Sequence, residues 1–306
     1  MAFESFEQIV QVCQEKSVSF AEAVIGEDMK DRLVTREVTL EKMRYIWNSM
    51  LEAGRSYDEN RISTSGLVGG DGGRMSHYAD SGHTLCGDRM SRVIAQALQM
   101  GESNACMKRI VAAPTAGACG VLPAVLIPLF EETKQDCTSS ASASEAPVLT
   151  EDDFVLSLFV AAGIGQVIAT RASIAGASGG CQAEIGSASA MAAGALVFLR
   201  GGCCDAIVQS AAMSLKNLLG LVCDPVSGLV EVPCVKRNVI GAVNAMSAAD
   251  MALAGIKSMI PADQVVDAMK EVGDLMDVSL RETGRGGLAA TREAIEITKK
   301  IQGISK

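Results

Sequence analysis

Three cysteines lie in one stretch, residues 176–238, beside residues that turn the backbone. Cys181 follows Gly176-Ala-Ser-Gly-Gly, and Cys223 and Cys234 flank Asp-Pro-Val-Ser-Gly-Leu-Val-Glu-Val-Pro. Glycine and proline favour loops that direct thiols or amides toward a bound group, unlike the periodic apolar run of a core helix. The stretch therefore predicts a functional site. Burial without reactivity is the alternative for any free cysteine, and we assign it to Cys13, Cys106, Cys137, Cys203 and Cys204.

The spacing of the three cysteines limits the chemistry. Cys181 precedes Cys223 by 42 positions and Cys234 follows it by 11, which does not match the tight ferredoxin pattern. The sequence contains no Cys-x-x-Cys, which argues against a thioredoxin pair and common zinc ribbons. Three thiolates suit a 4Fe-4S cluster with one iron left free of protein ligands. Such an iron is a Lewis acid, and with a base at the adjacent carbon it permits dehydration of a hydroxylated substrate.

Charge and hydropathy exclude several other classes of function. The net charge of −9 argues against nucleic acid, which needs clustered Lys and Arg. The N-terminus has neither a basic nor an apolar signal region, so we expect a cytoplasmic chain with reduced cysteines. Residues 110–130 carry no charge, but three prolines interrupt them and predict a loop leading into a helix. Together with core helices at Phe154–Thr170 and Gly186–Leu199, this predicts a protein without a membrane span.

Composition and periodicity predict an all-α fold. Hydrophobic residues make up 48% of the chain and aromatic residues only 4%, which favours close helix packing through small residues over a β-sandwich. We expect an N-terminal helical segment over residues 1–60, where apolar residues fall at helical spacing and Ser19 with Glu22 matches a capping box. Residues 61–306 are expected to form a large helical catalytic domain with glycine-rich loops around a buried cluster site, and 137–150 a surface loop.

Three further motifs have open interpretations. Ser63–Arg74 is rich in glycine and predicts a loop whose amides can approach an anion, although it matches no P-loop or dinucleotide fingerprint. His77, His83 and Cys86 lack a fourth ligand at recognisable spacing, so surface or packing roles are favoured over zinc. Arg281–Leu288 predicts either a carboxylate clamp made by two arginines or a solvated turn.

Five pieces of the sequence, in order, carry a family resemblance. They are Ser65–Asp71, Ala113–Gly120, Gly179–Gly186, Cys223–Asn238 and Arg281–Gly287. Over residues 65–288 the chain resembles the α chain of the iron–sulfur-dependent L-serine dehydratases, also called L-serine ammonia-lyases.

The resemblance implies an all-helical catalytic domain and a 4Fe-4S cluster held by Cys181, Cys223 and Cys234. It implies conversion of L-serine to pyruvate and ammonia through aminoacrylate, without pyridoxal phosphate. Its Pro-Thr-x-Gly-x-x-Gly motif is similar to the family's substrate loop, which makes Thr115, Gly117 and Gly120 candidates for holding the serine carboxylate or amine. Ser65 and the glycines after it are candidates for closing the pocket.

Three departures from the family pattern carry expectations of their own. Single-chain relatives fuse a regulatory β-type domain and often have a histidine shortly before the second cysteine, where this chain has Asn217. No β-type domain is found in this sequence, so we expect a separate β chain, and the sequence does not identify the base. The C-terminal cysteine that serves as a resting fourth ligand in single-chain enzymes is absent from Gln-Gly-Ile-Ser-Lys306.

Other functions stay open at this point. A related lyase acting on cysteine or threonine is the nearest, because pocket size separates hydroxyl from thiol substrates poorly. A pyridoxal-phosphate lyase would need a Schiff-base lysine, and no motif assigns that role to Lys216. A non-catalytic iron–sulfur sensor would bind a cluster without turning over an amino acid.

Overall fold

The computed structural model describes residues 3–136 and 149–303, and helices dominate this part of the chain. It contains thirteen α-helices and no strand among the described residues, which confirms the all-α prediction. The predicted surface loop over 137–150 lies outside the described residues except for its last two positions. The elements are α1 (Phe6–Lys16), α2 (Phe20–Arg32), α3 (Arg36–Arg55), α4 (Asp71–Asp80), α5 (Gly87–Ala105), α6 (Val121–Asp136), α7 (Glu151–Arg171), α8 (Gly176–Gly179), η1 (Gln182–Gly186), α9 (Ser187–Leu199), α10 (Cys204–Lys216), η2 (Val226–Gly228), α11 (Cys234–Leu253), α12 (Ala262–Leu275), η3 (Val278–Leu280), η4 (Gly287–Ala290) and α13 (Arg292–Ile301).

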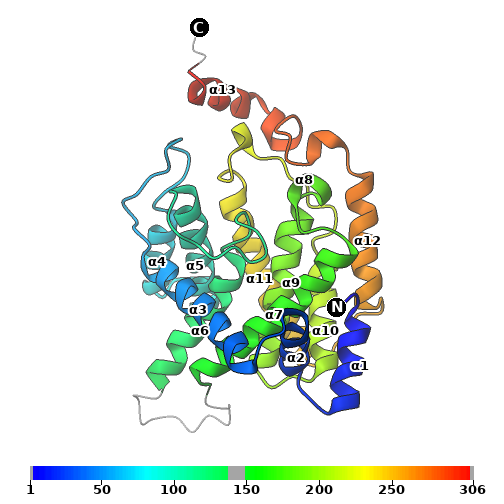
Figure 1. Ribbon diagram of the computed structural model, residues 1–306. Helices are drawn as coiled ribbons and strands as arrows, with labels where there is room; N and C mark the ends of the chain where they lie inside the picture. Colours follow the sequence, from blue (N-terminus) through cyan, green and yellow to red (C-terminus); the bar gives the residue numbers. More distant parts are fainter. Residues whose placement is uncertain (1–2, 137–148, 304–306) are drawn as a thin grey trace.

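Helix α9 forms the centre of the bundle, and α7, α10 and α11 surround it (Figure 1). Small residues let these helices approach closely: a Cβ placed on Gly194 would lie 2.2 Å from Cδ1 of Ile164 on α7. Two segments have the length and hydropathy of a membrane span, α7 and residues 182–199, but 67% and 89% of them are buried inside the protein. They are core helices, as the sequence predicted.

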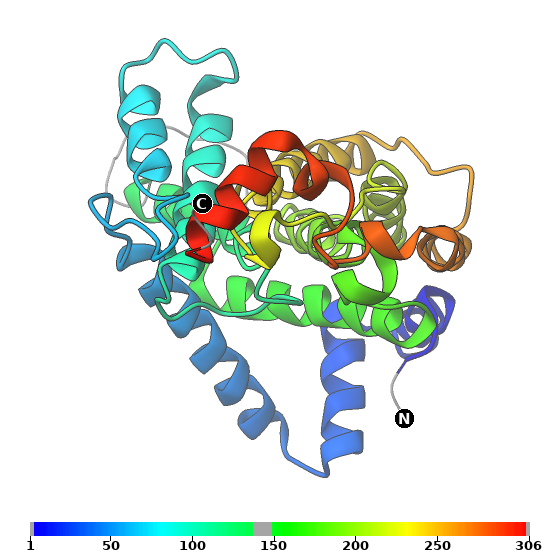
Figure 2. The same cartoon turned by 90° about the horizontal axis from the view of Figure 1, so that it is seen from above.

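The N-terminal helices α1, α2 and α3 begin at the polar caps that the sequence offers. Ser5, Ser19 and Thr35 each accept a hydrogen bond from a backbone N–H in the first turn, and Ser19 bonds Glu22 as the capping pattern predicted. Figure 2 shows α2 and α3 meeting α7 from one side. There Trp47 stacks on Phe154 at a centroid distance of 5.4 Å, so these helices contribute to the central core.

One end of the bundle gathers the segments that carry the predicted site. In Figure 1, α8 and the first turn of α11 lie at this end, and the chain from α12 to α13 crosses above them. The uncharged stretch 110–130 consists of a loop followed by α6, as predicted. The Gly-rich stretch differs partly from prediction: residues 63–70 form a loop, but 71–74 already belong to α4.

Candidate active site

Cys181 is presented by a sharp turn between α8 and η1. Gly180 ends α8 with φ 75°, and a Cβ on it would lie 2.7 Å from the Met276 side chain and 2.9 Å from the Leu221 carbonyl oxygen. Only glycine fits there without displacement. The chain then enters a π-helical turn, a rare geometry that is frequent at functional sites. Cys181 is 3% exposed, so its thiol points into the protein.

Cys223 lies in an extended segment that pairs with the C-terminal part of the chain. Its N–H donates to the Leu280 carbonyl at 2.8 Å, and its carbonyl accepts from Glu282 N–H at 2.7 Å. The side chain of Cys223 is 3% exposed. A Cβ placed on Gly176 would lie 3.0 Å from Cys223 Sγ and 2.7 Å from Glu184 Oε2, so α8 leaves room for both groups at one point.

Cys234 is the first residue of α11 and is half-buried, directly after Pro233. The three thiols therefore come from three different segments, and their role as ligands stays a prediction. Burial raises the pKa of Cys223, and the charges of Cys181 and Cys234 raise it further. Burial raises the pKa of Cys181 to about 12 and that of Cys234 to about 11.

These thiols fit a cluster better than a single ion. Among the described residues, no three His, Cys, Asp or Glu side chains converge closely enough to hold one metal ion. Ligands of one ion must converge on a point, whereas each thiolate of an iron–sulfur cluster binds its own iron. Two buried thiols and the half-buried Cys234, on separate segments, are compatible with the wider cluster.

Glu184 is one of the charged side chains beside these thiols, with Arg237 and Glu282, and the sequence did not single it out. Its Oε1 accepts a 2.7 Å hydrogen bond from Thr115 Oγ1, which brings the predicted substrate loop to η1. Burial raises the pKa of Glu184, the Thr115 bond lowers it, and the charge of Glu282 raises it further. Glu184 also raises the pKa of Cys223 and of Cys234. A charged residue within an otherwise apolar stretch was the signal available in the sequence.

The other residues of the predicted substrate loop converge on the same place. A Cβ on Gly117 would lie 3.1 Å from Glu184 Oε1, so this glycine leaves space beside the carboxylate. Gly120 N–H donates to Asn238 Oδ1 at 2.8 Å, and a Cβ there would lie 2.8 Å from the Ala97 carbonyl oxygen. Thr115, Gly117 and Gly120 therefore line or support the site, whereas their contact with substrate stays a prediction.

Ser65 has a different set of contacts. Its hydroxyl donates a short hydrogen bond to Glu231, a buried residue between Cys223 and Cys234, and Ser63 donates to the same oxygen at 3.0 Å. Ser65 Oγ also accepts from Leu67 N–H at 3.1 Å. Ser65 thus fastens the Gly-rich loop to the loop that carries two of the cysteines, and its role toward substrate stays a prediction.

The amides of the Gly-rich loop do approach an anion, but that anion belongs to the protein. Glu102 is 1% exposed and accepts from Asp71 N–H at 2.8 Å and Gly72 N–H at 3.2 Å. Tyr57 donates its hydroxyl to the same carboxylate at 2.6 Å. A carboxylate at a helix N-terminus is stabilised by the dipole and the free N–H groups. This internal cap explains why residues 71–74 are helical.

The remaining candidates lie outside the thiol site. His83 and Cys86 are exposed, and His77 is 71% exposed and lies 3.5 Å from Glu59, as expected for surface residues. Lys216 donates to Ser258 at 3.3 Å.

The stretch Arg281–Leu288 is anchored to the site by its backbone. Arg281 forms a parallel β-bridge with Cys223, and Leu288 N–H donates to Asp224 Oδ2 at 2.7 Å. Neither Arg281 nor Arg285 makes an ion pair within the described part of the chain. The stretch is therefore more than a solvated turn, and the carboxylate clamp stays a prediction.

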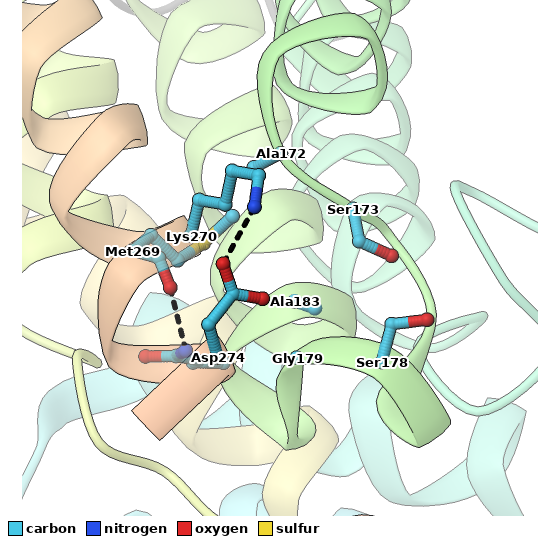
Figure 3. A pocket seen from close by; sticks show the side chains of 9 residues that line it. Ala172, Ser173, Ser178, Gly179, Ala183, Met269, Lys270 and Asp274 are labelled. Atoms are coloured by element: carbon cyan, nitrogen blue, oxygen red, sulfur yellow. Dashed lines mark hydrogen bonds and ion pairs between the residues drawn. The ribbon is translucent and has the colours of Figure 1, made fainter. Parts of the chain in front are cut away.

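A separate hollow of about 280 Å³ lies between α12 and the segment around α8. Figure 3 shows the Lys270–Asp274 ion pair on one side of it and Ser173 and Ser178 on the other. None of the three cysteines lines this hollow, so it is distinct from the thiol site.

Comparison with known proteins agrees with this arrangement. The family described as "Serine dehydratase alpha chain" matches residues 15–289. The chain belongs to the serine dehydratase alpha chain family. It is 43% identical to "Probable L-serine dehydratase, alpha chain" of Bacillus subtilis, over 98% of this chain and 96% of that protein. It is 40% identical to "L-serine dehydratase, alpha chain" of Peptoniphilus asaccharolyticus, over 95% of this chain and 96% of the relative.

Longer members of the serine dehydratase group also match. "L-serine dehydratase 1" of Escherichia coli is 33% identical over 94% of this chain, but the match covers only 61% of that protein. An alpha chain of the present length therefore corresponds to part of the longer relative, while it spans nearly all of its alpha-chain relatives. The predicted resemblance is confirmed.

Proposed function

We propose that this chain catalyses the deamination of L-serine to pyruvate and ammonia, with a 4Fe-4S cluster held by Cys181, Cys223 and Cys234. The observation that carries the proposal is the meeting of Cys223 and Glu184 beside Gly176, next to the turn that presents Cys181, with Glu184 hydrogen-bonded to the Thr115 loop. The relatives named as L-serine dehydratase alpha chains support the substrate. When bound, such a cluster supplies an iron that acts as a Lewis acid toward the substrate hydroxyl.

The protein's own groups have defined tasks in this reaction. Glu184 is the side chain placed to accept the proton from Cα of serine; the hydroxyl leaves Cβ as hydroxide, which takes up that proton from Glu184 to form water, and aminoacrylate remains. Thr115 orients the Glu184 carboxylate through its 2.7 Å hydrogen bond. The loop glycines allow a small substrate to approach that carboxylate closely. Aminoacrylate then tautomerises and hydrolyses to pyruvate and ammonia.

Anaerobic reconstitution with iron and sulfide tests the proposal. We expect the absorbance of a 4Fe-4S cluster and pyruvate formation from serine, and Cys223→Ala should abolish both. Cys86→Ser changes an exposed cysteine outside the site and should leave both unchanged. Full activity of the Cys223→Ala chain would falsify the cluster mechanism.

The same preparation separates the competing functions. Steady-state assays with serine, threonine and cysteine should favour serine, and equal or greater turnover of cysteine would assign the chain to the desulfidases instead. A cluster without any turnover would point to a sensor. Exposure to air should bleach the cluster and stop turnover, because an iron open to substrate is also open to oxidants.

We also propose that a separate β chain completes the enzyme in a reducing, cytoplasmic setting. Relatives named as alpha chains imply a partner, and the longer single-chain relatives carry additional sequence that this chain does not match. Turnover should rise when the β chain is co-expressed. Equal turnover with and without it would remove the β chain from the catalytic unit.

A further inference from the structure

Two successive residues of α11 reach back over the cysteine that starts this helix. Arg237 and Asn238 follow Cys234 by three and four positions, and residues at these spacings share a helix face. The side chain of Arg237 is 13% exposed and Asn238 is 1% exposed. Polar groups that deep must be paired, so their partners indicate what they hold.

Asn238 joins α11 to the substrate loop. Its Nδ2 donates to the Gly117 carbonyl at 2.9 Å and to the Cys234 carbonyl at 3.0 Å. Its Oδ1 accepts from Gly120 N–H at 2.8 Å. Both amide hydrogens and the oxygen are thereby used, and the loop is held at two points.

Arg237 joins α11 to the Cys223 segment. Its Nη1 donates to the Val222 carbonyl at 2.7 Å, and its Nη2 lies 2.8 Å from Asp224 Oδ1. The other oxygen of Asp224 accepts from Leu288 N–H at 2.7 Å, which adds the C-terminal segment to the same network. Among the described residues, Asp224 Oδ1 accepts no hydrogen bond, so Arg237 holds this carboxylate as an ion pair while it donates to Val222 through its other terminal nitrogen.

We propose that Arg237 and Asn238 are positioning residues that fix the substrate loop and the Cys223 segment relative to Cys234. Arg237 sets the distance between two cluster ligands, and Asn238 sets the distance between a cluster ligand and the loop that holds serine. The assignment rests on the proposed function in treating these segments as ligand and substrate elements. The geometric linkage itself does not depend on the reaction.

Asn238→Asp tests the second linkage with almost no change of shape. The carboxylate keeps an acceptor for Gly120 N–H but places negative charge against the Gly117 and Cys234 carbonyls. Asn244→Asp is the matched control, because Asn244 lies further along α11 and donates to Ser189 and Ser214 in the core. Both variants lose buried donors and should lose thermal stability to a similar extent.

Two measurements distinguish positioning from general destabilisation. In the apo chain, hydrogen exchange over residues 115–120 should be about tenfold faster in Asn238→Asp and unchanged in Asn244→Asp. In the reconstituted enzyme, KM for serine should rise about tenfold in Asn238→Asp only, with iron content retained. Equal effects in the two variants, or no effect on exchange in Asn238→Asp, would overturn the role of Asn238.

Arg237→Lys tests the first linkage, since lysine keeps the charge but has one nitrogen, which cannot both donate to the Val222 carbonyl and lie beside Asp224 as the two terminal nitrogens of Arg237 do. Iron bound per chain after reconstitution should fall about tenfold. Arg171→Lys is the control: Arg171 makes a comparable two-pronged contact with Asp267, away from the thiols. Iron content that is equal in these two variants would overturn the role of Arg237. If the wild-type chain bound iron but released no pyruvate, the proposed function would fail, while the exchange and iron measurements would still decide the positioning roles.

Discussion

At the scale of single residues, Glu184 is the side chain on which the reaction depends most. Glu184→Gln keeps a hydrogen-bond acceptor for Thr115 but removes the charge and the proton acceptor. We expect kcat to fall by about 100-fold or more with iron content unchanged. Burial raises the pKa of Glu184, so wild-type turnover should decline as the pH falls through that raised pKa, because the protonated acid cannot act as a base. Rate–pH profiles of both proteins check this, and an undiminished kcat in the variant would exclude Glu184 as the base.

Cys119 provides a pH test at a thiol outside the predicted ligand set. It lies in the substrate loop between Gly117 and Gly120, and its Sγ donates to the Met100 carbonyl at 3.7 Å. Burial raises its pKa from 9.0 to about 12 in the folded chain. Above pH 9 the unfolded chain releases this proton while the folded chain keeps it, so stability from this group is complete below pH 9 and is lost as the pH rises toward 12. Above pH 9, the free energy of unfolding should fall less steeply with pH in Cys119→Ala than in the wild type, and the two slopes should differ by about 1.4 kcal/mol per pH unit. Urea titrations of the apo chain at pH 8 to 10.5 measure this, and parallel curves would contradict it.

Some residues of the site could be predicted from the sequence, and others could not. Glycine and proline mark the turns around the three cysteines locally, whereas the ligand roles and the substrate loop came from the family resemblance and stay predictions. Glu184 could not be predicted, because its partner Thr115 lies 69 positions away in the sequence and the contact exists only after folding. Asn238 is the last residue of the Cys223–Asn238 motif, but its three hydrogen bonds likewise depend on how α11 packs against the loop.

At the scale of elements, the C-terminal segment is held over the site by a glycine. Gly287 has φ 58°, and a Cβ there would lie 2.3 Å from Asp224 Oδ2. Gly287→Ala should push the segment off Asp224 and break the Leu288 hydrogen bond, at a cost of about 1–3 kcal/mol. Gly255→Ala is the matched control, because Gly255 has φ 82° with open space around it and incurs only the backbone strain.

Thermal unfolding and limited trypsin digestion measure this difference. Cleavage at Arg281 and Arg285 should accelerate in Gly287→Ala, since the backbone bonds to Cys223 and Asp224 no longer protect the segment. Equal melting temperatures and cleavage rates for the two variants would show that the contact with Asp224 does not hold the segment.

Helix prediction from sequence succeeded where the pattern was local. Apolar periodicity and polar caps predicted the helices at the N-terminus, and uncharged runs predicted the core helices α7 and α9. The start of α4 was predicted as loop because glycines argue against helix. The Glu102 carboxylate, contributed by α5, caps that turn and overrides the local preference.

At the scale of the whole molecule, the predicted boundary near residue 60 is open to a direct test. The buried core includes Phe6 and Trp47 from the N-terminal helices together with Phe154 and Met269 from the remainder. Trp47 contacts Phe130 and Phe154 at centroid distances of 5.3 and 5.4 Å. A core shared in this way predicts that the N-terminal helices and the rest unfold in one cooperative step.

The chain has a single tryptophan, so its fluorescence reports on this junction alone. Trp47 is fully buried, and its emission should shift to longer wavelength at the urea concentration where far-UV circular dichroism reports loss of helix. Trp47→Phe confirms the assignment by removing the signal while keeping an apolar ring against Phe154. If fluorescence changed at a lower urea concentration than circular dichroism, α1–α3 would form a separate unit. Coincident midpoints would instead mean that any change loosening α3 also destabilises the bundle that holds the three cysteines.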